Sequence, residues 1–223
     1  MVLPGTRLFS QYKEKKFNPI TTEEASEIIA EAKRFIPRYC RIMRIQRDIP
    51  TKLIAAGVDI TNLRQHVHEK LKQKKIQCNC IRCREPKNII IQSNDVKIMK
   101  TEYAASNGTE IFISADDVRN NLILGFCRLR IPFRPFRKEI TGNSAGVREL
   151  HVYGAAMPIG NNNNAMQSMQ HKGYGLKLLS EAEAIAARDF GVKKLLVIAG
   201  IGARPYFARL GYKKDGVYMS KKI

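Results

Sequence analysis

A run of short apolar segments separated by turn signals constrains the fold of this chain more than any other feature. Asn107-Gly108 is a strong signal for a tight turn between two antiparallel strands. Pro132 ends another apolar segment, because proline cannot donate a hydrogen bond to a neighbouring strand. These signals predict a largely antiparallel sheet. The expected strands are residues 96–104, 109–115, 122–131 and 147–153.

Helical periodicity becomes prominent in the last third of the chain. Residues 173–190 have the apolar spacing of an amphipathic helix. After it we expect a strand at 192–199, a short helix at 203–210 and a last strand at 217–222. This mixture predicts an α+β fold, and an apolar content of 44% is enough for a packed core.

The first part of the chain has a different character, with more helical signals. Thr21 and Glu24 have the spacing of a capping box, which predicts a helix that Pro37 ends. Residues 39–49 interleave basic and apolar side chains and are predicted to form a strand. Thr61 is expected to cap a second helix.

Charge is the strongest compositional feature. The chain has 39 Lys and Arg against 20 Asp and Glu, a formal net charge of +19. Such a surface favours a polyanionic partner, nucleic acid first and an anionic membrane second, although a generally basic proteome would also produce it. No apolar run approaches the roughly 18 residues of a membrane span, and the first residues lack the pattern of a secretory signal. We therefore expect a cytoplasmic protein with no membrane partner.

A cluster of cysteines follows the second predicted helix. Cys78, Cys80 and Cys83 form the pattern C-x-C-x-x-C, whose thiolates can converge on one ion, with zinc as the default. The fourth ligand would come from outside the chain or from one of three residues, Cys40, His66 and His68. The alternative is three reduced cysteines in a basic turn, with both histidines on a solvated helix face. The C-x-x-x-C-x-x-C spacing of radical S-adenosylmethionine enzymes is absent from the sequence.

A glycine-rich pattern precedes the long helix. Gln170, Gly173 and Gly175 form Q-x-x-G-x-G, with His171 and Lys172 adding positive charge. A helix start presents unpaired N–H groups and a partial positive charge, which together suit a pyrophosphate. Taken alone, the pattern is just as typical of an ordinary glycine-rich helix start. The dinucleotide-binding and Walker patterns are absent from the sequence.

The order of strand, glycine-rich loop, long helix, apolar strand and tyrosine-bearing short helix resembles the cofactor core of the GNAT acetyltransferases. In that family the loop wraps the pyrophosphate of coenzyme A, and the strand before it, here Glu149–Tyr153, pairs with pantetheine. The resemblance implies that Tyr206 lies beside the coenzyme sulfur, where a phenol can protonate the leaving thiolate. The alternative places Tyr206 on an apolar helix face, which is the interpretation we favour for Phe207 and Leu210.

Five motifs occur in the order typical of one family. Through them the chain resembles, over essentially its whole length, the C-terminal portion of the catalytic subunit three of Elongator in its archaeal form. That family joins a radical S-adenosylmethionine domain to a GNAT-like acetyltransferase domain and converts the wobble uridine of certain tRNAs to 5-carboxymethyluridine. The motifs are Arg44–Pro50, Cys80–Glu85, Arg148–Gly154, Gln170–Gly175 and Tyr206–Tyr212.

The resemblance implies acetyl-CoA as a substrate and a bound zinc. It implies a catalytic role for Tyr206, and His151 and Glu149 are the nearby candidates for a catalytic base. The implied acetyl-CoA contacts are Leu150, His151, Val152, Tyr153, Gln170, His171, Lys172, Gly173, Tyr174, Gly175 and Tyr206. The implied zinc ligands are Cys78, Cys80 and Cys83. The 4Fe-4S cluster and S-adenosylmethionine of the whole family protein bind to a radical domain whose cluster-binding cysteines this sequence lacks.

The same resemblance divides the chain into three regions. Residues 1–38 look like the end of the radical domain, residues 39–92 like a basic zinc-binding linker, and residues 93–223 like a GNAT-like acetyl-CoA-binding domain. A truncated form of a longer protein is expected, because residues 1–20 look like the middle of a domain.

The leading hypothesis is a tRNA-modifying acyltransferase, or part of one, that binds the anticodon stem-loop of tRNA and hydrolyses acetyl-CoA when tRNA is bound. One alternative is a protein lysine acetyltransferase, which the charge of +19 disfavours because it repels basic tails. The other is a non-catalytic tRNA-binding module. The sequence is also compatible with a homodimer and, where the organism has them, with other Elongator subunits. Phosphate contacts are expected from residues 64–87 and from Arg128, Arg130, Arg134 and Arg137.

Overall fold

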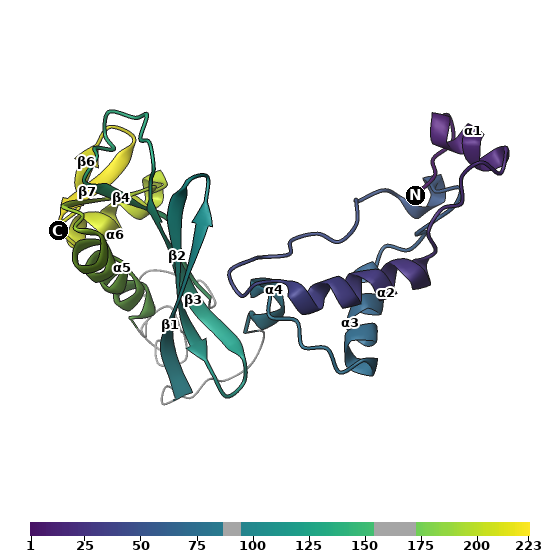
Figure 1. Cartoon of the computed structure of the whole chain (residues 1–223), viewed down its shortest axis with the longest axis horizontal. Coiled ribbons are helices and arrows are strands. Elements are labelled where there is room, and N and C mark those ends of the chain that lie inside the picture. Colours follow the sequence, from purple (N-terminus) through teal and green to yellow (C-terminus); the bar gives the residue numbers. More distant parts are fainter. Residues whose placement is uncertain (87–94, 154–172) are drawn as a thin grey trace. The chain divides into compact units, whose positions relative to one another are not determined.

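The computed structural model describes residues 1–86, 95–153 and 173–223 (Figure 1). It divides the chain into two compact units, Met1–Arg84 and Glu85–Ile223. Each unit has an apolar core of its own. None of the helices in the described ranges is long and apolar enough to cross a membrane.

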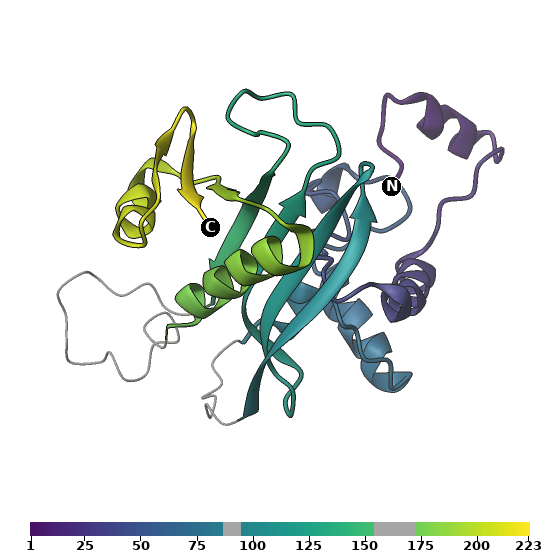
Figure 2. The same cartoon turned by 60° about the vertical axis from the view of Figure 1, so that its left-hand side comes forward.

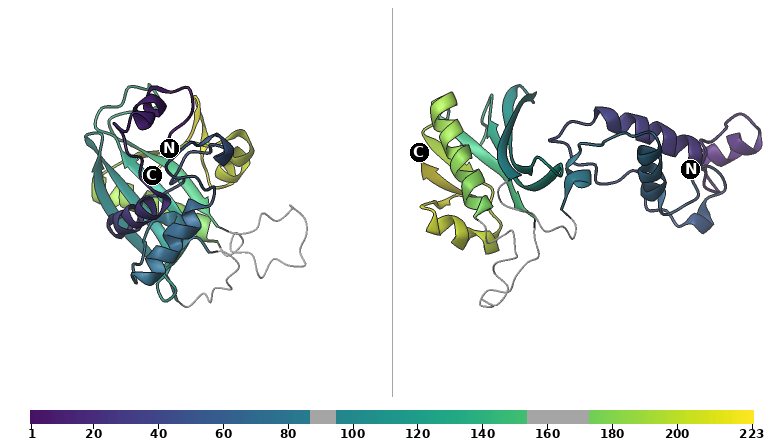
Figure 3. Two further views of the ribbon diagram at one scale, coloured as in Figure 1. Left: turned by 90° about the vertical axis from the view of Figure 1, so that its right-hand side faces the viewer. Right: turned by 90° about the horizontal axis from the view of Figure 1, so that it is seen from below.

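The first unit is built from helices and irregular segments. Helices α2 and α3 pack against each other through apolar side chains that include Ala25, Ala30 and Val67 (Figure 3). Lys70 and Lys74 of α3 form ion pairs with three glutamates of α2 at positions 23, 27 and 31. The elements are α1 (Arg7–Lys13), α2 (Thr22–Ala32), η1 (Lys33–Phe35), η2 (Thr51–Leu53), α3 (Leu63–Gln73) and α4 (Ile81–Arg84).

The start of α2 confirms the predicted capping box. The backbone N–H of Glu24 donates to the Thr21 hydroxyl at 3.2 Å, and the Glu24 carboxylate accepts from the backbone N–H of Thr21 at 2.8 Å. Hydrogen bonding from the backbone and side chain of Thr21 lowers the pKa of Glu24. Helix α3 starts differently, because Asn62 rather than Thr61 is its N-cap and makes no side-chain capping bond.

The predicted strand at residues 39–49 is wrong, because this segment is irregular in the structure. Hydrogen bonds that involve side chains hold the segment against its surroundings. The Arg64 guanidinium donates to the carbonyl oxygens of Ile42 and Met43, at 3.3 and 2.9 Å. The amide of Gln46 donates to the carbonyl oxygen of Ile60 at 2.8 Å. The segment is therefore a loop that side chains hold in place.

The second unit is built on a seven-stranded sheet in the order β1-β2-β3-β4-β5-β7-β6. Neighbouring strands are antiparallel except β4 and β5, which are parallel. Helix α5 (Tyr174–Phe190) lies along one face of the sheet (Figure 2). This mixed, largely antiparallel sheet confirms the predicted GNAT-like α+β fold. The remaining elements are β1 (Val96–Ala105), β2 (Gly108–Asp117), β3 (Leu122–Ile131), β4 (Ser144–Val152), β5 (Lys194–Val197), η6 (Ile201–Ala203), α6 (Arg204–Arg209), β6 (Lys213–Asp215) and β7 (Tyr218–Lys222).

The β1–β2 hairpin forms as predicted, but its turn lies one residue earlier. Ser106 and Asn107 have the positive φ angles, 43° and 58°, that a primed hairpin turn requires. Gly108 instead begins β2 and pairs with Ala105. A Cβ atom at Gly108 would lie 2.5 Å from the carbonyl oxygen of Ile131, so this glycine is needed for close strand packing.

The two faces of the sheet carry different residues, as the alternation of side chains along a strand requires. One face packs on α5 and includes Ile111, Leu129 and Val147, which belong to the core of the second unit. Cys127 lies in this core as well, and burial raises the pKa of its thiol to about 12. The other face carries Phe112 and Phe126, whose ring centroids lie 5.3 Å apart.

Candidate functional site

A bulge at the middle of β4 creates the conditions for a pocket. Strands β4 and β5 pair in parallel from Ser144 and Lys194 to Val147 and Val197. Just beyond, Leu129 of β3 pairs with Val147 but Arg128 pairs with Glu149, so Arg148 is an extra residue. Such a bulge bends a strand and increases its twist. The segment after the bulge stays paired with β3, and in the described ranges no strand pairs with its other edge.

The pocket lies beside this edge of β4. Its volume is about 320 Å³, and eight residues line it. They come from three segments, the end of β4, the start of α5 and the start of α6, which lie between residues 150 and 207 of the chain. The lining residues are Leu150, Val152, Gly173, Gly175, Leu176, Ala203, Tyr206 and Phe207. A cavity of this size, largely apolar and with one phenol, fits the narrow end of an organic ligand.

The start of α5 supplies backbone N–H groups to the pocket. Gly173 is the N-cap, with φ 74° and ψ 11°, and it makes no side-chain capping bond. A left-handed conformation of this kind favours glycine. A Cβ atom at Gly175 would lie 3.2 Å from the Tyr206 hydroxyl, so the second glycine allows this phenol to approach the helix. The uncapped N–H groups and the helix dipole together suit an anionic ligand.

Tyr206 is the polar group of the pocket, and its side chain is half-buried. Burial raises the pKa of its phenol, and the nearby Arg209 cation opposes that shift in part. The phenol is therefore protonated at neutral pH and can donate a hydrogen bond or a proton. Phe207, by contrast, is buried in the core and packs on Tyr212 at a ring-centroid distance of 5.8 Å, as we expected for an apolar helix face.

His151 and Tyr153 belong to a different environment. The imidazole of His151 stacks on Phe126 at 5.7 Å and meets the Tyr153 ring at 4.5 Å. The Tyr153 hydroxyl donates to the carboxylate of Glu85 at 3.1 Å. These contacts lie on the sheet face opposite α5, because alternate residues of β4 point to opposite faces. The structure brings Leu150 and Val152 to Tyr206, and it does not bring the side chains of His151 and Tyr153 there.

The other predicted site residues lie in different surroundings. The Tyr174 side chain is buried in the core, which raises its pKa, so only its backbone could face a ligand in the pocket. Glu149 forms an ion pair with Arg128 at 3.0 Å on the face opposite α5. Gln170, His171 and Lys172 lie outside the described residues. The catalytic role of His151 and the ligand contacts remain predictions.

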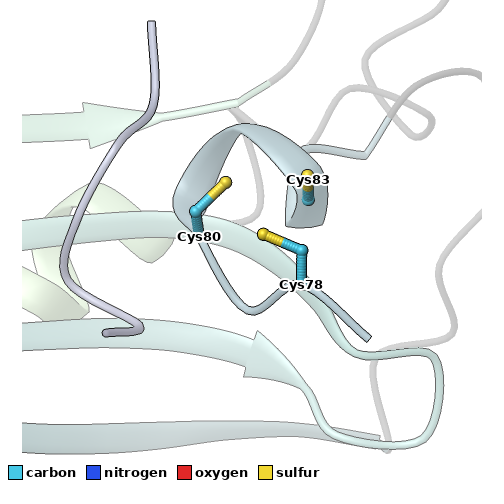
Figure 4. Close-up of side chains that lie close together, drawn as sticks. All are labelled: Cys78, Cys80 and Cys83. Atoms are coloured by element: carbon cyan, nitrogen blue, oxygen red, sulfur yellow. The ribbon is translucent and has the colours of Figure 1, made fainter. Parts of the chain in front are cut away.

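The second candidate site is the cysteine cluster of the first unit. The Sγ atoms of Cys78, Cys80 and Cys83 all lie within 4.8 Å of one another (Figure 4). Cys83 is carried by α4, and the backbone N–H of Ile81 anchors that turn by donating to the carbonyl oxygen of Cys40 at 2.9 Å. Tetrahedral zinc with Zn–S bonds of about 2.3 Å needs sulfur atoms about 4 Å apart. The three thiols therefore fit a zinc ion with little movement.

Lys33 joins this cluster, and sequence analysis did not identify it. Its side chain is buried, with a relative exposure of 3%, and its Nζ lies 3.9 Å from the Sγ of Cys80. Desolvation disfavours the charged ammonium, but the three sulfur atoms outweigh it and raise the pKa of Lys33. Hydrogen bonds from the Cys78 and Cys83 thiols, together with Lys33, lower the pKa of Cys80. Lys33, the C-cap residue of α2, continues the helical spacing of the buried residues Ser26 and Ala30. That spacing is the sequence signal from which its burial could have been predicted.

The proposed fourth ligands do not join the cluster. Among the residues that the structure describes, the metal-ligating group contains the three cysteines alone, without Cys40, His66 or His68. A three-ligand site leaves one coordination position for water or for a group from outside the chain.

The comparisons with known proteins agree on one family. Residues 1–73 match the model of the radical SAM C-terminal domain. Over its whole length the chain is 46% identical to the tRNA uridine(34) acetyltransferase of Methanocaldococcus jannaschii and covers 42% of that protein. It is 35% identical to Elongator complex protein 3 of Saccharomyces cerevisiae and covers 41% of it.

The chain is homologous to the C-terminal part of these proteins. It spans less than half of the length of these Elongator protein 3 relatives. A solved structure of Methanocaldococcus infernus Elp3 with an N-terminal deletion superposes with a TM-score of 0.89 at 43% identity. That match covers 100% of this chain and 54% of the other. The fold described above is therefore that of the matching part of Elp3.

The four arginines of the second unit that were expected to contact phosphates divide into two groups. Arg128 contacts Glu149 and the Tyr103 hydroxyl and lies over Phe112 at 5.0 Å, and Arg130 donates to the carbonyl oxygens of Ala105 and Ser106. Both side chains are less than one-fifth exposed, so they act within the sheet. Arg134 and Arg137 lie in an exposed loop. The structure thus favours the second pair over the first as contacts for an external anion.

Proposed function

We propose that this chain binds acetyl-CoA and tRNA and takes part in the 5-carboxymethylation of a wobble uridine. In this proposal tRNA stimulates the hydrolysis of acetyl-CoA in the pocket. The observation that carries it is the arrangement of the Tyr206 phenol against Gly175, at the start of α5 and beside the edge of β4 with which no strand of the described ranges pairs. The names of the archaeal relatives, tRNA uridine(34) acetyltransferases, support both the acyl chemistry and the tRNA substrate.

In this proposal, each side of the pocket binds a different part of acetyl-CoA. The backbone of Leu150 and Val152 offers hydrogen bonds to pantetheine, as it would to a neighbouring strand. The backbone N–H groups after Gly173 offer donors to the pyrophosphate. Hydrolysis adds water to the thioester carbonyl carbon, the carbon–sulfur bond breaks, and Tyr206 gives its proton to the departing thiolate. The products are acetate and coenzyme A, and water restores the phenol.

The zinc part of the proposal concerns the first unit. Cys78, Cys80 and Cys83 would hold the ion, which would cross-link α4 to the segment before it. Zinc with three thiolates carries one net negative charge, which the Lys33 ammonium balances. We therefore assign zinc a structural role here. The radical chemistry, with its iron–sulfur cluster and S-adenosylmethionine, would belong to the rest of a whole-length family protein.

The tRNA half rests on charge. A chain with a formal charge of +19 binds a polyanion mainly by displacing its counterions, so affinity for tRNA should fall steeply as salt rises. An affinity that does not change between low and physiological salt would contradict this account.

The deciding experiment measures the release of coenzyme A from acetyl-CoA with and without tRNA. Coenzyme A is separated by chromatography, because the chain has five cysteines that would react with a thiol reagent. Tyr206→Phe is expected to lower the tRNA-stimulated rate about a hundredfold, since general acids contribute on that order, and Tyr12→Phe is the matched control. The Tyr206-dependent rate should stay constant between about pH 6 and about pH 9, because its raised pKa keeps the phenol protonated there.

Other outcomes point to other functions. Release that ignores tRNA but requires a peptide would favour a lysine acetyltransferase. No release and no binding of acetyl-CoA, with tRNA binding intact, would favour a non-catalytic tRNA-binding module. Binding of acetyl-CoA without release of coenzyme A would mean that hydrolysis requires the rest of a whole-length protein.

A further inference from the structure

The connection between β3 and β4 exposes an unusual run of side chains. Residues 133–138, with the sequence Phe-Arg-Pro-Phe-Arg-Lys, are all exposed. The Phe133 side chain is 60% exposed and the Phe136 side chain is 91% exposed. Exposing two aromatic rings to water is unfavourable, and burying them against a partner would lower the free energy. Such exposed rings often mark a binding surface.

Hydrogen bonds and an ion pair at Glu139 and Ile140 hold the C-terminal end of this loop in place. Glu139 is buried, and its carbonyl oxygen accepts from the Lys194 ammonium at 2.7 Å. Its carboxylate lies 3.6 Å from Nε of Arg137. The backbone N–H of Ile140 donates to the carbonyl oxygen of Arg137 at 3.0 Å. Pro132 and Pro135 restrict the backbone further. The exposed rings are therefore presented by an anchored segment, the teal connection after β3 in Figure 2.

Charge and shape together define the partner. The guanidinium of Arg134 lies over the Phe133 ring at 5.5 Å, and that of Arg137 lies over Tyr218 at 5.9 Å. With Lys138 the loop has three cations, and its one carboxylate, Glu139, is buried. Residues 133–138 offer flat rings beside positive charges, and Pro135 is the only other apolar residue among them. Unpaired bases joined by phosphates have the complementary chemistry, because bases stack on aromatic rings and phosphates attract arginine.

We propose that residues 133–138 form a stacking platform for single-stranded RNA, with Phe133 and Phe136 each accepting one unpaired base. This inference rests on the proposed function, since it names the part of the chain that holds unpaired nucleotides of the tRNA. Arg134 and Lys138 contact the adjoining phosphates. Recognition of this kind tolerates many sequences, because every base has a flat face.

The platform and the pocket lie at opposite ends of β4. The loop joins the first residue of β4, Ser144, whereas Leu150 and Val152 line the pocket at its other end. A strand rises about 3.3 Å per residue, so about 20 Å separates the two ends. Changes in the loop should therefore alter RNA binding and leave the chemistry of bound acetyl-CoA unchanged.

The test compares the affinities of three RNAs by fluorescence anisotropy: a tRNA, an unstructured oligonucleotide and a duplex. Phe133→Leu/Phe136→Leu keeps the apolar volume and removes both rings. We expect it to weaken binding of the oligonucleotide and the tRNA at least tenfold, from the loss of two stacks, and to leave the duplex unaffected. Phe136→Tyr should retain binding. Phe35→Leu, at another highly exposed phenylalanine, is the matched control, with 78% exposure.

Several results would overturn the platform. They are an unchanged affinity for the oligonucleotide, an equal loss for the duplex, or an equal loss in Phe35→Leu. If anionic vesicles bind the unmodified chain through the same two rings while RNA binding is unaffected, the loop is a membrane contact and the proposal is wrong. Thermal unfolding of each variant checks that the chain still folds.

Failure of the proposed function gives a different pattern. The same variants are assayed for coenzyme A release without RNA, where the platform predicts no change. An unmodified chain that does not bind or cleave acetyl-CoA contradicts the proposed function even if the oligonucleotide binds through Phe133 and Phe136. A chain that hydrolyses acetyl-CoA but binds the oligonucleotide without these rings contradicts the platform alone.

Discussion

In the first unit the candidate metal cluster is made of side chains on an irregular backbone. Three thiols and one ammonium converge there from a turn, a short helix and the end of α2. In the second unit the backbone sets the shape of the pocket, through a bulged strand edge, a glycine in the left-handed conformation and a helix start without a side-chain cap. The metal cluster therefore depends on the identity of its side chains, whereas the pocket depends on the conformation of the backbone around it. Substitutions should therefore damage the two sites in different ways.

Cys80→Ser is expected to have the largest effect. Cys80 is fully buried in the core of the first unit, and losing a ligand to a structural zinc removes much of the folding free energy that the ion supplies. We expect the bound zinc to fall from about one ion per chain to almost none, and the free energy of unfolding of the first unit to fall by about 3 kcal/mol or more. Native mass spectrometry and calorimetry measure both.

Cys40→Ser is the matched control, because Cys40 lies outside the cluster, and it should keep the zinc. If Cys80→Ser also abolished acetyl-CoA binding, the two units would not be independent and the comparison between them would fail.

Gly175→Ala tests the backbone-built pocket. The new Cβ would lie 3.2 Å from the Tyr206 hydroxyl and 3.6 Å from Cγ2 of Val152, so one of the pocket walls must move. Overpacking of this kind costs about 1–3 kcal/mol, and we expect acetyl-CoA to bind about tenfold more weakly by calorimetric titration. Gly142→Ala, where a Cβ meets nothing within 4 Å, is the control. Equal affinities for the two variants would mean that acetyl-CoA does not occupy this pocket.

Lys33→Met tests whether the buried ammonium strengthens zinc binding at the cysteine cluster. It removes the only buried ammonium in the described ranges and leaves three thiolates and zinc with an unbalanced negative charge. We expect zinc affinity to fall about tenfold in competition with a chromophoric chelator, a magnitude typical of outer-sphere partners of metal ligands. Lys33→Arg should recover part of the affinity. An exposed lysine of α3 gives the control, Lys72→Met, and a loss of similar size there would indicate a general charge effect.

Thr21→Ala should have the smallest effect. It removes both side-chain bonds of the capping box at α2, which costs about 1 kcal/mol of the free energy of unfolding of the first unit. Thr6→Ala is a useful comparison, because Thr6 caps α1, which buries no residue, and should cost less. Denaturant unfolding followed by helical circular dichroism distinguishes them. A larger loss from Thr6→Ala would contradict the view that packing on α3 stabilises α2.

The fold was predictable wherever local signals agreed with the final contacts. The capping box of α2, the β1–β2 hairpin and the long helix α5 all depend on neighbours in sequence. The prediction of a strand at residues 39–49 was wrong, and there the carbonyl oxygens of Ile42 and Met43 accept from Arg64, some 20 residues away, instead of from a neighbouring strand. The hairpin turn shifted by one residue because Gly108 is required by Ile131 of another strand, which no local pattern reveals.

The candidate sites were predictable to different depths. The three cysteines could be identified because their spacing is short and their chemistry is specific. Lys33 was missed because its partners lie 45 or more residues away along the chain. The pocket residues Leu150 and Tyr206 were anticipated through a family resemblance, but the orientation of His151 was not, because it depends on a bulge that appears only when two strands pair.

That bulge changes which side chains of β4 face the pocket. Counting by twos from Val147 on the core face would send Glu149, His151 and Tyr153 to the pocket, a wall of titratable groups. The single extra residue at Arg148 exchanges the two sets, so Leu150 and Val152 face the ligand and the titratable groups face away. Deleting Arg148 would remove the bulge and still leave Leu150 and Val152 on the pocket face, because Val147, Glu149 and Leu150 would then alternate regularly along the strand.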